Sequence, residues 1–260
     1  MGNCTICGEP CGWFKSEHKW CRIRKDKEEA LAEASRSKVR DTIHDAILKA
    51  TGANNQTLQG QIAEQVLLAG KDGLLKTISS IGRELLDDVR NDGTLDIQSI
   101  ESLIFEVLTD AGTTLDSLPA TEHNMLAKAC LANDLRHHRL THRISIPDHP
   151  FRFEKDESIV WGFTNAIFWR DRVIQGSGGL RLEDGGLLIV TTQGMWFQGG
   201  HKVYHVKYKE MASVNGRNNG VLFCKGTLTA RNVAFTIEDI DGWLLGYIVS
   251  ILARSGSSLR

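Results

Sequence analysis

The chain has 260 residues, of which 41% are hydrophobic and 24% charged, and it contains 25 glycines but only 4 prolines. These figures are ordinary for a soluble globular protein and leave room for two or three domains. The net charge of −1 and the pI of about 6.8 exclude a global electrostatic attraction to nucleic acid or to an anionic membrane.

The sequence indicates a cytoplasmic protein. Its N-terminus lacks the basic start and apolar run that are typical of a secretory signal. The longest apolar stretch, residues 243–253, is well short of the roughly 20 residues that a membrane-spanning helix needs. Because thiols stay reduced in the cytoplasm, clustered cysteines there bind a metal more often than they form disulfides.

The first 21 residues hold four of the six cysteines and one histidine. Cys4 and Cys7 form a Cys-x-x-Cys pair, in which a tight turn directs both sulfurs to one point. His18 and Cys21 lie three positions apart at the start of a predicted helix, so they share one face of it. We therefore predict a tetrahedral zinc site with Cys4, Cys7, His18 and Cys21 as ligands. Cys11 is left over and could replace His18 in this set.

A zinc ion in this segment would be structural. A segment of about twenty residues cannot bury a core, whereas a bound zinc supplies on the order of 10 kcal/mol of folding free energy. Four protein ligands leave no open position for a catalytic water. Ser16 is the predicted N-cap of the helix that follows. The spacing resembles that of a treble-clef zinc finger, and the simpler alternative is a set of free thiols or a disulfide.

Residues 25–145 follow a helical pattern. Apolar residues recur at spacings of three and four in several stripes, which we assign to core faces. The stripes comprise Val39, Ile43 and Ile47; Leu58, Ile62 and Val66; Leu74, Ile78, Ile81 and Leu85; and Ile97, Ile100, Ile104 and Val107. Turn-forming residues at 52–56, 70–73, 90–96 and 110–119 separate or interrupt them.

Residues 88–99 partly match a calcium-binding EF-hand loop, with Gly93 at its sixth position. Arg90 stands on the third ligand position, and Ser99 stands where the closing glutamate is required. A cation at a ligand position argues against calcium. We therefore predict a plain link between two helices, in which Asp96 or Thr94 caps the second helix.

A second candidate metal site lies near the end of the helical region. Asp134, His138 and His142 are four residues apart and share one face of a predicted helix. Two histidines at this spacing can bind a metal, and a solvated helix face at a domain boundary is the simpler explanation. The sequence leaves open whether His138 and His142 bind anything.

After residue 150 the hydrophobic period changes from 3.6 to 2, with Pro147 and Pro150 in the link. An apolar helix then closes the chain, capped by Asp239 or Asp241, with Trp243, Tyr247, Val249 and Leu252 as its predicted buried residues. Before it, we predict strands at 158–163, 166–174, 187–191, 195–198, 202–208, 211–215, 221–225 and 231–237. About seven strands and one C-terminal helix form the plan of a pleckstrin-homology (PH) barrel, in which the helix covers an open end of the sheet.

Residues 185–223 and the Asp-Gly-Trp at 241–243 resemble bacterial PH-like domains. The whole arrangement resembles a family of uncharacterised bacterial proteins with a treble-clef-like zinc finger, a helical middle and a C-terminal PH-like domain. The resemblance implies an α+β multidomain fold: a zinc finger at 1–24, an all-α helical domain at 25–145 and a PH-like β-barrel capped by a helix at 151–254. It implies no activity.

The sequence contains no G-x-S-x-G, Walker lysine, HExxH or paired-carboxylate motif, so we do not expect an enzyme. In the first predicted hairpin of the barrel three arginines are balanced by three acidic residues, so phosphoinositide binding is not expected. These residues are Arg170, Asp171, Arg172, Arg181, Glu183 and Asp184.

We expect a non-enzymatic, zinc-binding adaptor that binds another protein through its PH-like domain. The alternative is a nucleic-acid-binding protein that uses the zinc finger and the adjoining helix. That helix carries a short basic run beside Trp13 and Trp20, namely Arg22, Arg24, Lys25 and Lys27. Acidic residues between and after these positions dilute the run. The sequence does not fix the oligomeric state.

Overall fold

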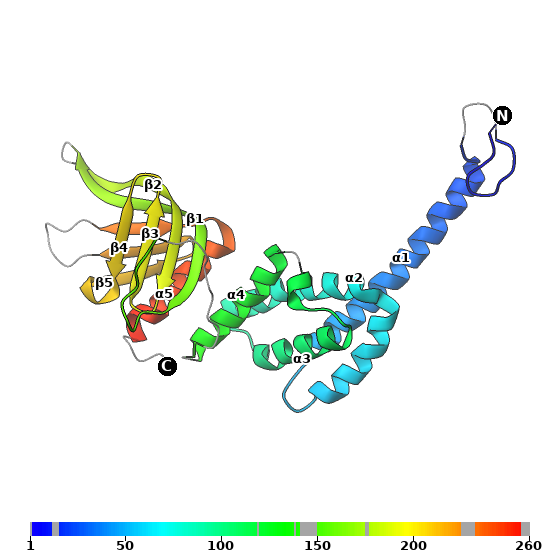
Figure 1. Ribbon diagram of the computed structural model, residues 1–260, viewed down its shortest axis with the longest axis horizontal. Helices are drawn as coiled ribbons and strands as arrows, with labels where there is room; N and C mark the ends of the chain where they lie inside the picture. Colours follow the sequence, from blue (N-terminus) through cyan, green and yellow to red (C-terminus); the bar gives the residue numbers. More distant parts are fainter. Residues whose placement is uncertain are drawn as a thin grey trace. The chain divides into compact units, whose positions relative to one another are not determined.

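The computed structural model describes residues 2–11, 16–118, 120–137, 139–140, 150–174, 177–224 and 232–255. The chain forms two compact units, residues 1–127 and 128–260, and the boundary between them lies within helix α4 (Ala120–Arg136). The first unit is helical and the second contains a sheet (Figure 1). The division into three domains at 1–24, 25–145 and 151–254 stays a prediction.

The helical unit consists of α1 (Lys19–Leu48), α2 (Asn55–Arg90), α3 (Ile97–Asp110), the short η1 (Leu115–Ser117) and the first part of α4. Its core is built from the predicted stripes, because residues at spacings of three and four lie on one helix face. Val39, Leu58 and Val66 are half-buried at the margins. The fully buried members are Ile43, Ile47, Ile62, Leu74, Ile78, Ile81, Leu85, Ile97, Ile100, Ile104 and Val107.

The link between α2 and α3 contains the predicted cap at Asp96. The carboxylate of Asp96 accepts a hydrogen bond from the backbone N–H of Ser99 at 3.1 Å, which is the geometry of an N-cap. The carboxylate of Asp88 accepts one from the N–H of Leu95 at 3.2 Å. Both carboxylates therefore bind backbone donors of the turn. The predicted turn at 70–73 is a kink within α2, where Gly70 has a φ of 70° and a ψ of 171°.

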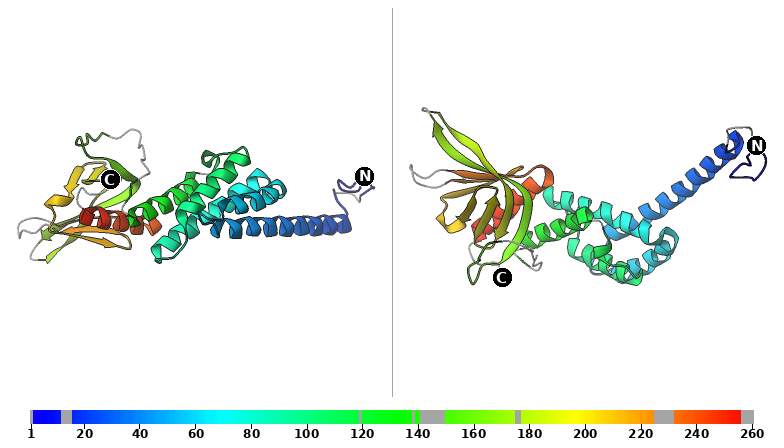
Figure 2. Two further views of the ribbon diagram at one scale, coloured as in Figure 1. Left: turned by 90° about the horizontal axis from the view of Figure 1, so that it is seen from below. Right: turned by 45° about the horizontal axis from the view of Figure 1, so that its top comes forward.

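The second unit is a curled antiparallel sheet followed by α5 (Asp239–Ser255) (Figure 2). The strands follow the order β4-β3-β2-β1-β7-β6-β5, so β4 and β5 are its edges. A short η2 (Tyr208–Glu210) follows β4. The strand bounds are β1 (Ile159–Ile174), β2 (Ser177–Thr191), β3 (Gly194–Gly199), β4 (Val203–Lys207), β5 (Ser213–Arg217), β6 (Gly220–Cys224) and β7 (Val233–Thr236).

The prediction of separate strands at 158–163 and 166–174 is wrong. They form the single strand β1, because an irregularity in register between Phe163 and Ala166 bends the strand without ending its pairing with β2. The strand predicted at 187–191 begins ten residues earlier, at Ser177. The remaining predicted strands coincide with β3 to β7 within a few residues, and residues 225 and 231 lie outside the described part.

Phenylalanines fill the inner face of the sheet. Phe168 stacks on Phe235 with ring centroids 5.2 Å apart and contacts Phe197 at 5.4 Å, and all three rings are fully buried. Phe223 completes the cluster, with its ring centroid 6.4 Å from that of Phe235. Ring pairs at these separations stabilise a core beyond the area that they bury.

Helix α5 packs directly on the edge of the sheet that contains β5. A Cβ at Gly246 would lie 2.6 Å from the carbonyl oxygen of Arg217, so only glycine allows this approach. The helix buries Leu244, Leu245, Ile248, Val249 and Leu252. The predicted burial of Trp243 and Tyr247 is wrong in degree, since both are half-buried and stack on each other at 5.1 Å. Within the described residues, no helix has the length and hydropathy to cross a membrane.

Candidate functional site

Residues 3–10 form a tight loop that holds two cysteines. Asn3 and Pro10 form an antiparallel bridge, and the N–H of Cys4 donates to the carbonyl of Glu9 at 2.7 Å. The N–H of Gly8 donates to the carbonyl of Cys4 at 2.9 Å, and Gly8 has a φ of 77°. This positive φ favours glycine after the second cysteine of the pair. The loop therefore fixes the sulfurs of Cys4 and Cys7 close together.

The start of α1 supplies the other two predicted ligands. His18 is the residue before the helix and Cys21 lies in its first turn. The predicted N-cap at Ser16 is wrong, because the helix begins two residues later than expected and His18 is its cap residue. The carbonyl of Ser16 instead accepts a hydrogen bond from the N–H of Thr5 at 2.9 Å, which ties the loop to the helix.

The structure brings the four predicted ligands into one cluster. Their ligand atoms all lie within 4.8 Å of one another. Nδ1 of His18 lies 3.4 Å from Sγ of Cys7 and 3.9 Å from Sγ of Cys21. A zinc ion with bonds of about 2.3 Å to sulfur places its tetrahedral ligands about 3.8 Å apart. The residues present therefore fit a tetrahedral metal ion.

The ring of His18 is oriented for metal binding. Its Nε2 lies 3.0 Å from the carbonyl oxygen of Pro10, which can only accept, so Nε2 carries the proton and donates it. Nδ1 is then the free nitrogen, and it faces Cys7. A histidine that binds a metal through one ring nitrogen usually donates the N–H of the other nitrogen to a carboxylate, a backbone carbonyl or water, which fixes the orientation of the ring.

Two of the thiols, Cys4 and Cys21, differ in their ease of deprotonation. The backbone N–H of Cys7 lowers the pKa of Cys4 to about 6. The neighbouring thiol of Cys7 and burial raise the pKa of Cys21 to about 11. A bound metal requires both as thiolates, and its charge would overcome this difference.

Cys11, the leftover cysteine, is buried beside the cluster and is not one of its four members. His138 and His142 lie outside the described residues.

The sheet carries a second feature, an apolar row on the face opposite the phenylalanine core. Leu182 on β2 pairs with Trp169 on β1, Trp169 pairs with Ala234 on β7, and Ala234 pairs with Leu222 on β6. Cross-strand partners share a face, so these four side chains form one continuous row. Leu182 is 60% exposed. An outward sheet face usually carries polar residues, so this row is unusual.

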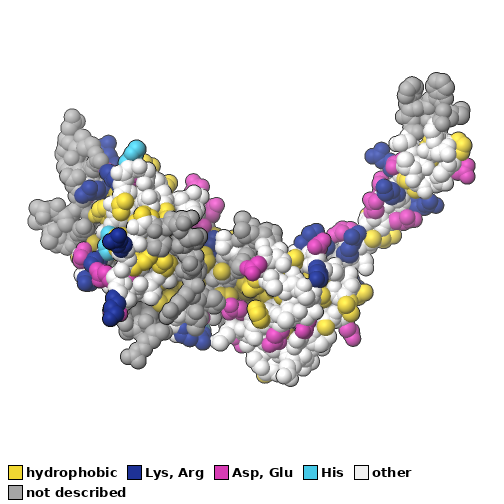
Figure 3. All heavy atoms as spheres, in the orientation of Figure 1, with side chains coloured by type: hydrophobic (Ala, Val, Ile, Leu, Met, Phe, Trp, Pro, Cys, Tyr) yellow, Lys and Arg dark blue, Asp and Glu magenta, His cyan; other side chains and the backbone are white. Residues whose placement is uncertain are grey.

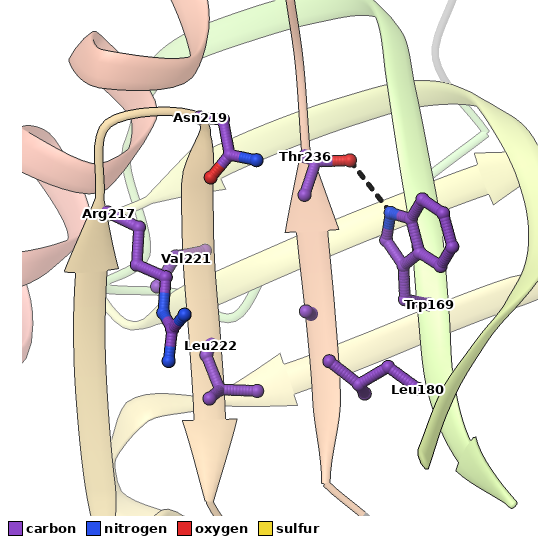
Figure 4. A pocket seen from close by; sticks show the side chains of 8 residues that line it. Trp169, Leu180, Arg217, Asn219, Val221, Leu222 and Thr236 are labelled. Carbon is purple, nitrogen blue, oxygen red and sulfur yellow. Dashed lines mark hydrogen bonds between the residues drawn. The ribbon is translucent and has the colours of Figure 1, made fainter.

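A groove of about 310 Å³ follows this row, and we call it the outer groove (Figure 4). Its wall is Trp169, whose indole N–H donates to the hydroxyl of Thr236 at 2.7 Å. Arg217 at the end of β5 and Asn219 in the following turn supply its polar groups, and Arg217 forms no ion pair with a described residue. The lining residues are Trp169, Leu180, Arg217, Asn219, Val221, Leu222, Ala234 and Thr236.

Sequence reasoning missed the outer groove. The signal was the pair Leu180 and Leu182, which alternates with the polar Arg181 and so places two leucines on one face of β2. Their assignment to the outer face needs the register with Trp169, which only the structure provides.

No protein-family model matches the chain, and no curated protein sequence matches it. A solved structure described as "Critical structural role for the PH and C1 domains of the Vav1 exchange factor" aligns with 87% of this chain at 10% identity and a TM-score of 0.25. The chain spans 66% of that protein, which is just under two thirds of its length. A TM-score this low carries no inference about function, and the resemblance to a bacterial family stays a prediction.

Proposed function

We propose that this protein is a non-enzymatic interaction protein with a PH-like C-terminal unit that binds another protein. Its N-terminal loop and the first turn of α1, which we call the head, would be held together by a zinc ion. The observation that carries the proposal is the outer groove, which combines an apolar floor with a single cation. The seven strands and the C-terminal helix support the PH-like assignment, since they follow the predicted plan of about seven strands and one closing helix.

The chemistry of the outer groove favours a partner segment that presents a carboxylate beside an apolar side chain. Arg217 offers a planar guanidinium that can bind a carboxylate through two parallel hydrogen bonds. Trp169 and Leu222 offer apolar surface for the neighbouring residue. Aromatic and arginine side chains at one site are the usual anchors of protein interfaces.

The proposed zinc ion has a structural role in this account. Cys4, Cys7, His18 and Cys21 would hold it and would join the N-terminal loop to the first turn of α1. A structural zinc supplies on the order of 10 kcal/mol to segments that bury little surface. The loop and the helix start would thus form one rigid head.

Nucleic-acid binding through the head is the second candidate. Trp20 is 78% exposed next to the basic run of α1, and an exposed tryptophan beside arginines can stack on a base. Against this, Glu28 lies 3.8 Å from Arg24 and Glu29 lies 3.9 Å from Lys25. These acidic neighbours reduce the local positive charge, so we rank this function below protein binding.

An array of synthetic peptides tests the proposal. One set places a glutamate beside leucine or phenylalanine, and a matched set replaces that glutamate with lysine. We expect the full-length, zinc-loaded chain to bind the first set and not the second. Arg217→Ala should lose most of this binding, because it removes the guanidinium and leaves the apolar floor in place.

Arg181→Ala is the matched control, since Arg181 lies on β2 between Leu180 and Leu182 and points to the other face. It should bind the peptides as the natural chain does. Binding that is unchanged in Arg217→Ala, or an array without any binding, contradicts the protein-binding function. Turnover of a bound peptide contradicts its non-enzymatic part. Salt-dependent binding of single-stranded DNA by the same chain would favour the second candidate.

A further inference from the structure

Among the described residues, the first half of α1 has no packing partner. Every residue from 22 to 36 is exposed, and the buried residues of this helix begin only at Ile43. The exposed stretch is about 22 Å long at 1.5 Å per residue. An isolated helix of this length is marginal in water, so surface pairs such as Arg24 with Glu28 hold it only weakly.

This exposed stretch carries an apolar stripe. Trp20, Ile23 and Leu31 are 78%, 46% and 64% exposed. Lys27, which lies between Ile23 and Leu31, and the two alanines Ala30 and Ala34 continue the spacing of three and four. We call these six residues the α1 stripe. Large apolar side chains on one face of an exposed helix are typical of a surface that binds another helix.

The stripe faces away from the core of the helical unit. A helix turns about 100° per residue, so Leu31 lies roughly 120° from Ile43 and 160° from Ile47, which both pack inward. By the same count Cys21 of the metal cluster lies about 160° from Ile23 and about 80° from Leu31, so the cluster lies to one side of the stripe. Among the described residues, therefore, neither the core of the helical unit nor the metal cluster covers the stripe.

The charges along the same stretch form two blocks of opposite sign. Residues 19–27 contain five basic residues and one acidic residue, a net charge of +4. Residues 28–33 contain three acidic residues and no basic one, a net charge of −3. Figure 3 shows basic and acidic side chains exposed along this helix. In a parallel pair of such helices, like charges would face each other, whereas an antiparallel pair centred near residue 27 sets each basic block against an acidic one.

We propose that two copies of this chain associate through the α1 stripe as an antiparallel helix pair centred on Lys27. In this register Ile23 of one copy lies opposite Leu31 of the second, and Trp20 lies opposite Ala34, a large side chain against a small one. The matching of apolar positions and the matching of charge blocks thus select the same alignment. This proposal does not depend on the outer groove, which lies in the other unit.

Lys27 makes the pair weak and reversible. The two Lys27 side chains meet at the centre of the antiparallel pair, where a charge in the seam lowers stability. Lys27→Leu should therefore tighten association by about tenfold, whereas Ile23→Glu or Leu31→Glu should abolish it.

Sedimentation equilibrium of the zinc-loaded full chain, over about a hundredfold range of concentration, tests the proposal. We expect the mass to rise from 28.9 kDa toward twice this value. Ile23→Glu and Leu31→Glu should each stay monomeric. Leu67→Glu is the matched control, because Leu67 on α2 is 86% exposed and lies outside the stripe. It should associate like the natural chain, and circular dichroism should show that all the variants are folded.

Charge reversal tests the orientation. A chain with Glu28→Lys and Glu29→Lys and a chain with Arg24→Glu and Lys25→Glu should each fail to associate alone, and an equal mixture of them should associate. A parallel pair would be insensitive to the first reversal, since like charges already face each other in it. A constant mass of 28.9 kDa at all concentrations, or association that survives both Ile23→Glu and Leu31→Glu, overturns the proposal. Association that survives the reversal of Glu28 and Glu29 overturns the antiparallel arrangement.

Discussion

Nδ1 of His18 lies 3.4 Å from Sγ of Cys7, and this contact joins the N-terminal loop to the start of α1. The opposite nitrogen of the ring is held by the carbonyl of Pro10. One side chain thus brings a nitrogen donor into a cluster that otherwise contains three sulfurs. The account of a structural metal depends on this ligand set of three sulfurs and one nitrogen.

The ligand set has a spectroscopic signature. We expect cobalt(II) in place of zinc to give the visible absorption of a tetrahedral site with one nitrogen and three sulfur ligands. His18→Cys should keep the metal and shift the bands to longer wavelength, because thiolate is the weaker-field ligand. His18→Ala should lower metal affinity, since one ligand is lost.

His44 provides the control, because its ring binds Glu84 at 2.9 Å, far along α1 from the cluster. His44→Ala should leave the cobalt spectrum unchanged. Bands that do not shift in His18→Cys would show that His18 is not a ligand, and would revive Cys11 as the fourth.

The packing of α5 on the sheet depends on Gly246. Gly246→Ala should lower the free energy of unfolding by about 1–3 kcal/mol, because its Cβ would lie 2.6 Å from the Arg217 carbonyl oxygen and must push the helix away. Urea denaturation measures the loss. Gly60→Ala in α2 is the control, since nothing lies within 4 Å of its added Cβ, and it should be neutral or stabilising by up to about 1 kcal/mol. Equal effects of the two substitutions would contradict the close approach of α5.

Much of the fold follows from hydrophobic periodicity, and the departures have local causes. The stripe of α3 is fully buried as predicted, because a strong apolar repeat leaves one packing solution. The split of β1 into two strands was wrong, because Thr164 and Asn165 interrupt the alternation where the structure has a bend. Periodicity cannot distinguish a bulge from a strand end.

The metal cluster and the outer groove differ in how far the sequence reveals them. The four predicted ligands lie within 21 residues, so local spacing alone brings them together. The outer groove joins Trp169 to Leu222 across β7, and that pairing depends on the register of strands more than 50 residues apart. The Ser16 cap was predicted incorrectly, because its carbonyl binds Thr5 in the head, an interaction with no signal in the helix sequence.

We expect His205 to make the stability of the sheet sensitive to pH. Its ring stacks on Trp196 with centroids 3.7 Å apart, and Nε2 is buried without a hydrogen-bond partner among the described residues. Burial lowers the pKa of His205 below its usual 6.5, and Lys207 adds to this, while the carboxylates of Glu157, Glu210 and Glu154 oppose it.

Because the pKa of His205 is lower in the folded state, the unfolded chain takes up the proton first as the pH falls. The stabilising contribution is therefore complete above about pH 6.5 and is lost as the pH falls toward the lowered value. Urea denaturation at about pH 7.5 and about pH 5.5 should show a smaller loss of stability in His205→Gln than in the natural chain. His201→Gln, at an exposed position, should retain the full loss. An unchanged loss in His205→Gln would contradict the assignment.

The metal content of the purified chain tests the central claim most directly. We expect one zinc per chain in the natural protein and in Cys11→Ser, measured by mass spectrometry of the metal after dialysis. We expect Cys21→Ser to lose the zinc and the protease resistance of residues 2–21. One tightly held zinc in Cys21→Ser, or its loss in Cys11→Ser, would contradict the proposed ligand set. A natural chain without any bound metal would contradict the claim that a zinc ion holds the N-terminal loop to the start of α1.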